Sequence, residues 1–144
     1  MEYSLLLIKP DAVRLKLNNE ILAKVAGAGL ETVFRREMRL TPEQVQELYR
    51  QHCQKEFFPY LKDFMISGPC EVCVVRGENA IKSLDELCGH NDPEKAASGT
   101  LRRIYGTGKS ENAVHSSSTW QSFEFELKLL LHTVNVSDLI AESG

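Results

Sequence analysis

The sequence lacks a long apolar run, a basic leader and a surplus of positive charge. No uninterrupted apolar segment approaches the roughly 20 residues that a membrane-spanning helix requires. The first residues, Met1-Glu2-Tyr3, include an acid where a secretory or transit signal has basic residues, so we expect a cytoplasmic protein. The formal net charge of −3 argues against a general electrostatic binder of nucleic acid, while a local basic site stays compatible with it.

Cysteine and phosphate-loop patterns are present but incomplete. Cys70 and Cys73 form a C-x-x-C pair within an apolar run. Positions three apart in a strand point to opposite faces, so the pair predicts two buried thiols and neither a metal site nor a disulfide. The segment Gly106–Ser110 ends like a phosphate-binding loop, but Arg103 stands where that pattern requires its first glycine. We therefore interpret Gly106–Ser110 as a glycine-rich surface turn.

Length and composition indicate one globular domain. The chain has 144 residues, of which 42% are apolar and 26% charged, and this suits a single hydrophobic core. The segment 134–144 is weakly patterned. We expect it to lie over the surface as a C-terminal tail of a domain formed by residues 1–133.

Hydrophobic periodicity predicts four strands separated by helices. The strands are expected at Tyr3–Ile8, Glu31–Leu40, Cys70–Val75 and in a short segment at Ala113–His115. Helices are expected at 19–28, from Pro42 behind a Thr41 capping box, at 56–65, at 80–87 and after Ser118. This order is typical of an α+β sandwich with a ferredoxin-like, four-stranded and mainly antiparallel sheet.

The segment His90–Ser117 is predicted to be mainly a loop, and the segment after it is predicted to be a helix. His90–Ser117 is rich in glycine, serine and threonine, and a loop of this length inside a compact domain is usually functional. The helix is expected to begin at a capping box of Ser118 and Gln121. Its predicted buried side chains are Trp120, Phe123, Leu127, Leu130 and Leu131.

Several short motifs together resemble a known family. The segment Leu5–Val13, which reads LLLIKPDAV, resembles the opening strand and phosphate-site lysine of the nucleoside diphosphate kinases. The tetrapeptide Asn112–His115 resembles the N-x-x-H active-site motif of the same family. Further matching segments follow in the order that the family shows: Phe57-Phe58, Ser67-Gly68-Pro69, Gly99–Arg102 and Tyr105-Gly106.

The resemblance implies a ping-pong phosphotransfer. A nucleoside triphosphate such as ATP passes its γ-phosphate to a histidine, and the phosphohistidine passes it to a nucleoside diphosphate, with Mg²⁺ carried on the nucleotide phosphates. His115 is the expected nucleophile, since an ordinary imidazole pKa of ~6.5 leaves the ring mostly neutral near pH 7. Glu126 matches the glutamate that orients the ring. An exposed helix acid is the alternative interpretation of Glu126.

The resemblance assigns further residues to the nucleotide. Lys9 and Arg102 match the cations around the phosphates, and Asn112 matches the residue that bonds the ribose and triphosphate. The remaining matches are Tyr49 near the nucleophile, the apolar pair Phe57 and Leu61 against the base, and Ser117 after the histidine. The alternative is ordinary: core packing for Phe57 and Leu61, and solvated charge for Lys9 and Arg102.

Several positions depart from the family pattern. Asp85 stands where the family usually has a phosphate-contacting arginine, and a carboxylate there repels phosphate. Asn91 replaces a phosphate-contacting threonine. Ser116 replaces a glycine and would strain the backbone if its φ were positive. Ser118 replaces an acid. These changes resemble those of a divergent branch of the family whose members are often poor kinases.

Two hypotheses therefore stand. The first is an active, slow nucleoside diphosphate kinase, and the second is a weak or inactive nucleotide-binding or assembly module of the same fold. A third class, single-stranded nucleic-acid binding through Arg35, Arg36 and Arg39, fits poorly with the acidic balance. The resemblance also implies a homo-oligomer, with a hexamer favoured over a tetramer or dimer.

Overall fold

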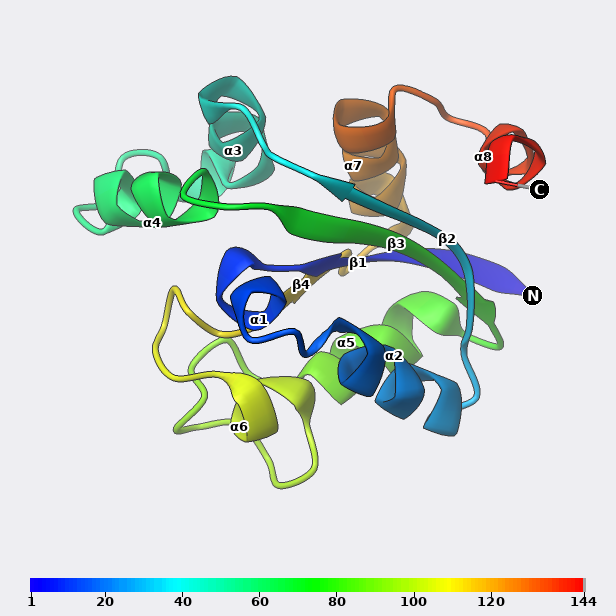
Figure 1. Cartoon of the computed structure of the whole chain (residues 1–144), viewed down its shortest axis with the longest axis horizontal. Helices are drawn as coiled ribbons and strands as arrows, with labels where there is room; N and C mark the ends of the chain where they lie inside the picture. Colours follow the sequence, from blue (N-terminus) through cyan, green and yellow to red (C-terminus); the bar gives the residue numbers. More distant parts are fainter. Residues whose placement is uncertain (144) are drawn as a thin grey trace.

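The computed structural model describes residues 1–143 and contains one antiparallel sheet with helices on both faces (Figure 1). The strand order is β2-β3-β1-β4, and every neighbouring pair is antiparallel. The strands are β1 (Glu2–Ile8), β2 (Glu31–Met38), β3 (Cys70–Gly77) and β4 (Val114–Ser116). This arrangement confirms the predicted ferredoxin-like α+β fold.

The helices divide between the two faces of the sheet (Figure 1). One face is covered by α1 (Pro10–Arg14), α2 (Asn18–Gly27), α5 (Ala80–Cys88) and α6 (Leu101–Tyr105). The other is covered by α3 (Pro42–Leu48), α4 (Phe58–Met65), α7 (Trp120–Leu131) and α8 (Val136–Ser143). A short 3₁₀ turn at Arg50–His52 links α3 to α4.

Side-chain alternation along the strands builds two cores, one on each face. Leu5 and Leu7 of β1 belong to one core, and Leu6 and Ile8 belong to the other. Cys70 and Cys73 also divide between the two cores, and both are free thiols, as their spacing predicts. Burial raises the pKa of Cys70 to about 12, so this thiol stays protonated at neutral pH.

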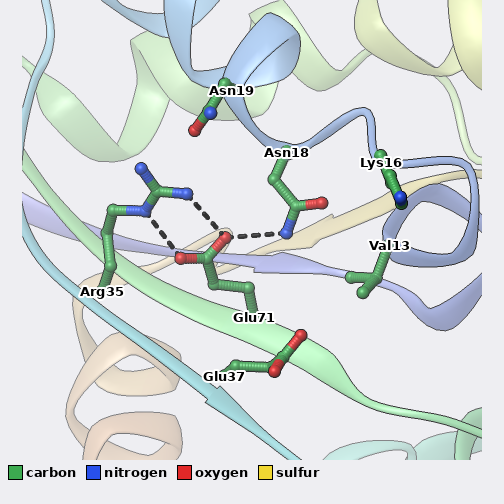
Figure 2. A pocket seen from close by; sticks show the side chains of 7 residues that line it. All are labelled: Val13, Lys16, Asn18, Asn19, Arg35, Glu37 and Glu71. Atoms are coloured by element: carbon green, nitrogen blue, oxygen red, sulfur yellow. Dashed lines mark hydrogen bonds and ion pairs between the residues drawn. The ribbon is translucent and has the colours of Figure 1, made fainter.

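A buried carboxylate ties the edge strand β2 to the rest of the sheet (Figure 2). Glu71 of β3 is only 6% exposed and accepts hydrogen bonds from Arg35 Nε at 2.6 Å and Asn18 Nδ2 at 2.8 Å. Burial opposes ionisation of Glu71, but the bonds from Arg35 and Asn18 outweigh it and hold the pKa of this carboxyl below its usual value. The pocket around Glu71 therefore contains an acid whose charge is balanced by Arg35. The bonds of Glu71 connect β2, β3 and α2.

The short helices and the cap of α7 differ from the sequence expectation. Helix α6 lies in the segment His90–Ser117 that was expected to be a loop, and α1 lies where no helix was expected. The N-cap of α7 is Thr119, whose capping box is completed by Ser122, so the prediction of Ser118 and Gln121 was wrong by one residue. Trp120 is 46% exposed and was wrongly placed in the core, because it is the first residue of α7 and lies at the end of the helix. The other four predicted core residues of this helix are buried.

Residues 136–143 form a helix, although the sequence pattern suggested a surface tail. Val136 is 8% exposed and Leu139 is 2% exposed, and both join the core on the α3, α4 and α7 face. The pattern is weak because the helix is only 8 residues long, too short to establish a helical period. Within residues 1–143, no helix combines the length and the apolar character needed to cross a bilayer.

Replacing Leu139 should reveal the contribution of α8 to the core. We expect Leu139→Ala to lower the free energy of unfolding by about 2–4 kcal/mol, because it removes a buried side chain and leaves a cavity. Val134→Ala is the control, since Val134 is 67% exposed. Urea unfolding of both variants measures the difference. Equal, small effects would show that α8 does not pack against the core.

Candidate active site

One cleft of about 1060 Å³ gathers nearly all the predicted site residues. It opens among β4, α5, the start of α4, the loop before β4 and the first turns of α7. The predicted residues that line it are Lys9, Tyr49, Phe57, Leu61, Asp85, Asn91, Arg102, Asn112, His115 and Glu126. Ser117 is fully buried and lies behind Glu126 instead of in the cleft wall.

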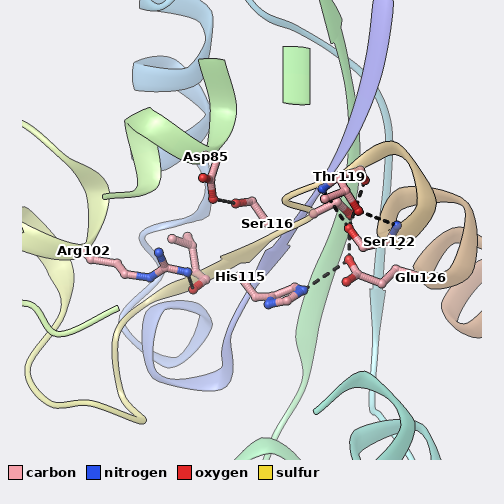
Figure 3. Close-up of polar contacts among 9 residues, drawn as sticks. Asp85, Arg102, His115, Ser116, Thr119, Ser122 and Glu126 are labelled. Carbon is pink, nitrogen blue, oxygen red and sulfur yellow. Dashed lines mark hydrogen bonds and ion pairs between the residues drawn. The ribbon is translucent and has the colours of Figure 1, made fainter. Parts of the chain in front are cut away.

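His115 is held against a buried acid (Figure 3). It pairs with Leu7 in the β4–β1 register, which directs its ring toward the α7 face. Glu126 Oε1 lies 3.2 Å from His115 Nε2, in a close approach that does not meet the geometry of an aligned hydrogen bond. Glu126 is 6% exposed and also accepts a hydrogen bond of 2.7 Å from Ser117 Oγ. The exposed-acid interpretation of Glu126 is therefore wrong.

Tyr49 packs against the ring of His115 at the floor of the cleft. The two ring centroids are 5.7 Å apart and the planes meet at 67°, an edge-on arrangement. Burial raises the pKa of the Tyr49 phenol, so the hydroxyl stays protonated. Its oxygen is buried and has no hydrogen-bond partner among the described residues. An unpaired buried hydroxyl beside the histidine suits a polar ligand in the cleft.

Lys9 is buried, although a lysine is usually solvated. It is 3% exposed, and its Nζ donates to the Ser110 carbonyl at 3.1 Å and to Asn112 Oδ1 at 2.7 Å. The Asn112 amide in turn donates to the Asn91 carbonyl at 2.8 Å. Burial, with a smaller effect of Arg102, lowers the pKa of Lys9 to about 7. The interpretation of Lys9 as a solvated charge is therefore wrong.

A strained residue between Asn112 and His115 is held by Asp11. Ala113 has a φ of 75°, in the left-handed region that a residue with a Cβ adopts at a cost of about 1 kcal/mol. Its amide donates to Asp11 Oδ2 at 3.1 Å, and its carbonyl accepts from the Lys9 amide at 2.9 Å. The sequence analysis noted Asp11 only as part of the motif LLLIKPDAV. Its contact across 102 residues has no local signal that sequence reasoning could use.

Arg102 is also buried, and its guanidinium is turned partly toward backbone carbonyls (Figure 3). One terminal nitrogen donates to Gly89 at 2.6 Å and the other to Val114 at 3.0 Å. Its Nε is buried and unpaired among the described residues. Arg102 is 5% exposed, so it is no solvated surface charge. It braces β4 while contributing positive charge to the cleft wall.

Asp85 and Ser116, two positions that depart from the family pattern, contact each other at the cleft wall (Figure 3). Ser116 Oγ donates to Asp85 Oδ1 at 3.4 Å, a long hydrogen bond. Ser116 lies in the extended strand β4 and does not have a positive φ, so its backbone is not strained. Positive φ occurs instead at Ala113. The Asp85 side chain lines the same cleft as Arg102 and adds negative charge to it.

The cleft also contains residues that the sequence analysis did not assign to the site. Arg50 places its guanidinium 5.2 Å from the centre of the Phe125 ring, and both line the cleft. Lys109, Gln121 and Ser122 line it as well. These side chains come from the 3₁₀ turn, the loop before β4 and α7. Only the three-dimensional arrangement brings them to one wall.

The same chain is similar to proteins of one family over most of its length. The family model described as nucleoside diphosphate kinase matches residues 2–136. A nucleoside diphosphate kinase of Persephonella marina is 40% identical over 136 residues, which cover 94% of this chain and 97% of that protein. A nucleoside diphosphate kinase of Nitrobacter hamburgensis is 40% identical over 127 residues, 88% of this chain and 91% of the relative.

Solved structures agree with the sequence relatives. The nucleoside diphosphate kinase of Aquifex aeolicus superposes with a TM-score of 0.83 and 35% identity, over 90% of this chain and 94% of that one. The halophilic enzyme of Halobacterium salinarum, solved in complex with CDP, gives a TM-score of 0.85 and 33% identity, over 90% and 86% of the two chains. The chain belongs to the nucleoside diphosphate kinase family and is thus a phosphotransferase, as the resemblance predicted.

The buried Lys9 should make nucleotide binding depend on pH. With a pKa of about 7, Lys9 is mostly neutral at about pH 8 in the free protein. A bound polyphosphate favours the charged form and raises this pKa, so we expect binding of a nucleoside diphosphate to take up a fraction of a proton. The affinity should correspondingly fall as the pH rises above the pKa of free Lys9.

Calorimetry in two buffers with different ionisation enthalpies measures this proton uptake. Lys9→Gln is the control, because it keeps a polar side chain but cannot bind the proton. Binding to the unmodified protein without proton uptake at about pH 8 would show that the ligand does not change the protonation of Lys9.

Proposed function

We propose that the protein is a nucleoside diphosphate kinase that carries the transferred phosphate on His115. The observation that carries this proposal is the convergence of His115, the buried Glu126 and the buried cation Lys9 on one cleft. Family membership supports the reaction type. It also disfavours the alternative of a non-catalytic module.

The geometry suggests which ring nitrogen reacts. Glu126 lies beside Nε2, so Nδ1 is the nitrogen left to attack the γ-phosphorus. The Nδ1 lone pair forms the new N–P bond while the bond from phosphorus to the bridging oxygen breaks, and the nucleoside diphosphate leaves. Positive charge develops on the imidazole in this step, and the Glu126 carboxylate stabilises it. The second half of the reaction reverses the first. A terminal phosphate oxygen of another nucleoside diphosphate attacks the phosphorus, and the bond between phosphorus and Nδ1 breaks.

The other cleft residues position the reactants. Lys9 and Arg102 supply positive charge for the phosphates, and Asn112 supplies an amide for the ribose or phosphate. Phe57 is 45% exposed at the cleft wall, where its ring can stack on a base with little regard to base identity. Ser117 acts through Glu126, which it holds in place by its 2.7 Å hydrogen bond. Tyr49 fixes the plane of the His115 ring.

The cleft suits a magnesium ion that is bound through the nucleotide phosphates. Within residues 1–143, no group of three His, Cys, Asp or Glu side chains could chelate a metal. Asp85 and Asp92 nevertheless place carboxylate oxygens, the donors that Mg²⁺ prefers, in the cleft wall. When bound, the ion neutralises phosphate charge. The homo-oligomeric assembly, with a hexamer favoured, and the cytoplasmic location stay predictions.

Phosphohistidine formation tests the proposed function. Incubation with γ-labelled ATP and magnesium should label the protein with a bond that is labile to acid and stable to base. His115→Ala should abolish the label, and addition of a nucleoside diphosphate should discharge it from the unmodified protein. His132→Ala is the matched control, since that histidine caps α7 away from the cleft. Label that survives His115→Ala would overturn the proposal.

Asp85 should limit the rate or the affinity of the reaction. We expect Asp85→Arg to tighten nucleotide binding roughly tenfold or more and to raise the transfer rate, because it removes a repulsion and adds a charge-assisted hydrogen bond. Asp85→Asn separates the two effects, since it removes the charge without adding a cation. Steady-state kinetics with both variants measures the change. If neither variant alters binding or rate, Asp85 does not face the phosphates.

A further inference from the structure

A hydrogen bond joins two segments that form opposite walls of the cleft. Phe57 and Leu61, at the beginning of α4, line one wall, and Ser110 and Asn112 line the other. Tyr60, next to Leu61, donates its hydroxyl proton to the Glu111 carboxylate, next to Asn112. Tyr60 and Glu111 do not line the cleft themselves, so the bond spans its margin.

The loop wall is anchored from the inside by the residues already described. Lys9 binds the Ser110 carbonyl and the Asn112 side chain, and the Thr107 amide donates to the Glu111 carbonyl at 2.8 Å. These contacts fix the loop to the end of β1. Among the hydrogen bonds within residues 1–143, the one between Tyr60 and Glu111 alone links α4 to this loop. The buried side chains of Leu61, Phe64 and Met65 anchor α4 to the core, so this bond fixes only the outer margin between α4 and the loop.

The bond is suited to opening and closing. Tyr60 is 57% exposed, so water can replace its partner readily. The acceptor is a carboxylate, which makes the bond charge-assisted. The hydrogen bond to Glu111 raises the pKa of the Tyr60 phenol, so the donor proton is present throughout the neutral range. The contact is charge-assisted but exposed, so it can break and re-form without disturbing the core.

We propose that Tyr60 and Glu111 are positioning residues that latch the α4 wall to the loop and so retain the nucleoside part of a bound nucleotide. This inference rests on the proposed function. The latch lies at the base-contacting residues Phe57 and Leu61, so it acts on ligands that carry a base and a sugar. It does not act on a bare polyphosphate, which Lys9 and Arg102 hold. Loss of the latch lets the nucleoside leave faster.

The chain offers a matched control for this contact. Tyr105 donates to the Glu20 carboxylate at 2.5 Å, the same exposed pairing of phenol and acid, but neither residue lines the cleft. Tyr60→Phe and Tyr105→Phe each remove one hydroxyl and keep the ring. Calorimetric Kd values for ADP and for inorganic pyrophosphate, measured on all three proteins, separate the nucleoside contribution from the phosphate contribution.

Tyr60→Phe should weaken ADP binding roughly three- to tenfold and leave pyrophosphate binding unchanged. In the transfer assay it should raise KM for the nucleotide without lowering kcat. Tyr105→Phe should leave both Kd values unchanged. Glu111→Ala also removes a charge that acts on Lys9, so the informative comparison is the cycle: in the Glu111→Ala background, Tyr60→Phe should cause no further loss of ADP binding, because the bond is already absent.

Three results would overturn the latch. They are unchanged ADP binding in Tyr60→Phe, equal losses for ADP and pyrophosphate, and additive effects in the double variant. If the unmodified protein transfers phosphate through His115 while Tyr60→Phe binds ADP normally, the latch fails and the proposed function stands. If the unmodified protein binds neither ADP nor phosphate, both fail together.

Discussion

The site depends on the buried connection between the end of β1 and the loop before β4. Lys9 donates to Ser110 and Asn112, and Asp11 accepts from the strained Ala113, so residues about one hundred positions apart are locked together. Lys9 is buried and Asp11 is half-buried, so leaving either polar group without its partner would be costly. The residues bonded to Lys9 and Asp11 therefore have little freedom to move. His115, two residues beyond Ala113, is held in place with them.

The overall fold could be predicted from the sequence because its strands and long helices have clear periodicity. The strands around Leu5 and Val74 are buried on both faces, and their apolar runs are unmistakable. The helices α1 and α6 escaped prediction because five-residue helices are shorter than the periodicity needed to detect them. The cap of α7 could not be placed, since Ser118 and Thr119 are both capable N-caps and only packing decides between them.

The candidate site was predictable only through its motifs. Composition gave no reason to prefer His115 over the other histidines. Without its motif, Lys9 would be interpreted as an ordinary solvated lysine. Pattern matching placed ten residues that the fold then brings to one cleft. It could not supply Asp11, Arg50 or the pairing of Tyr60 with Glu111, because those relations are contacts between distant segments and leave no mark on local sequence.

The exposed Trp120 gives the protein an internal optical reporter. It is the single tryptophan of the chain, it contacts Phe123 with ring centroids 5.2 Å apart, and its neighbour Gln121 lines the cleft. Indole emission responds to the polarity and the charges around the ring. Occupancy of the cleft can therefore be followed by intrinsic fluorescence in the unlabelled protein, without a dye that would crowd the opening.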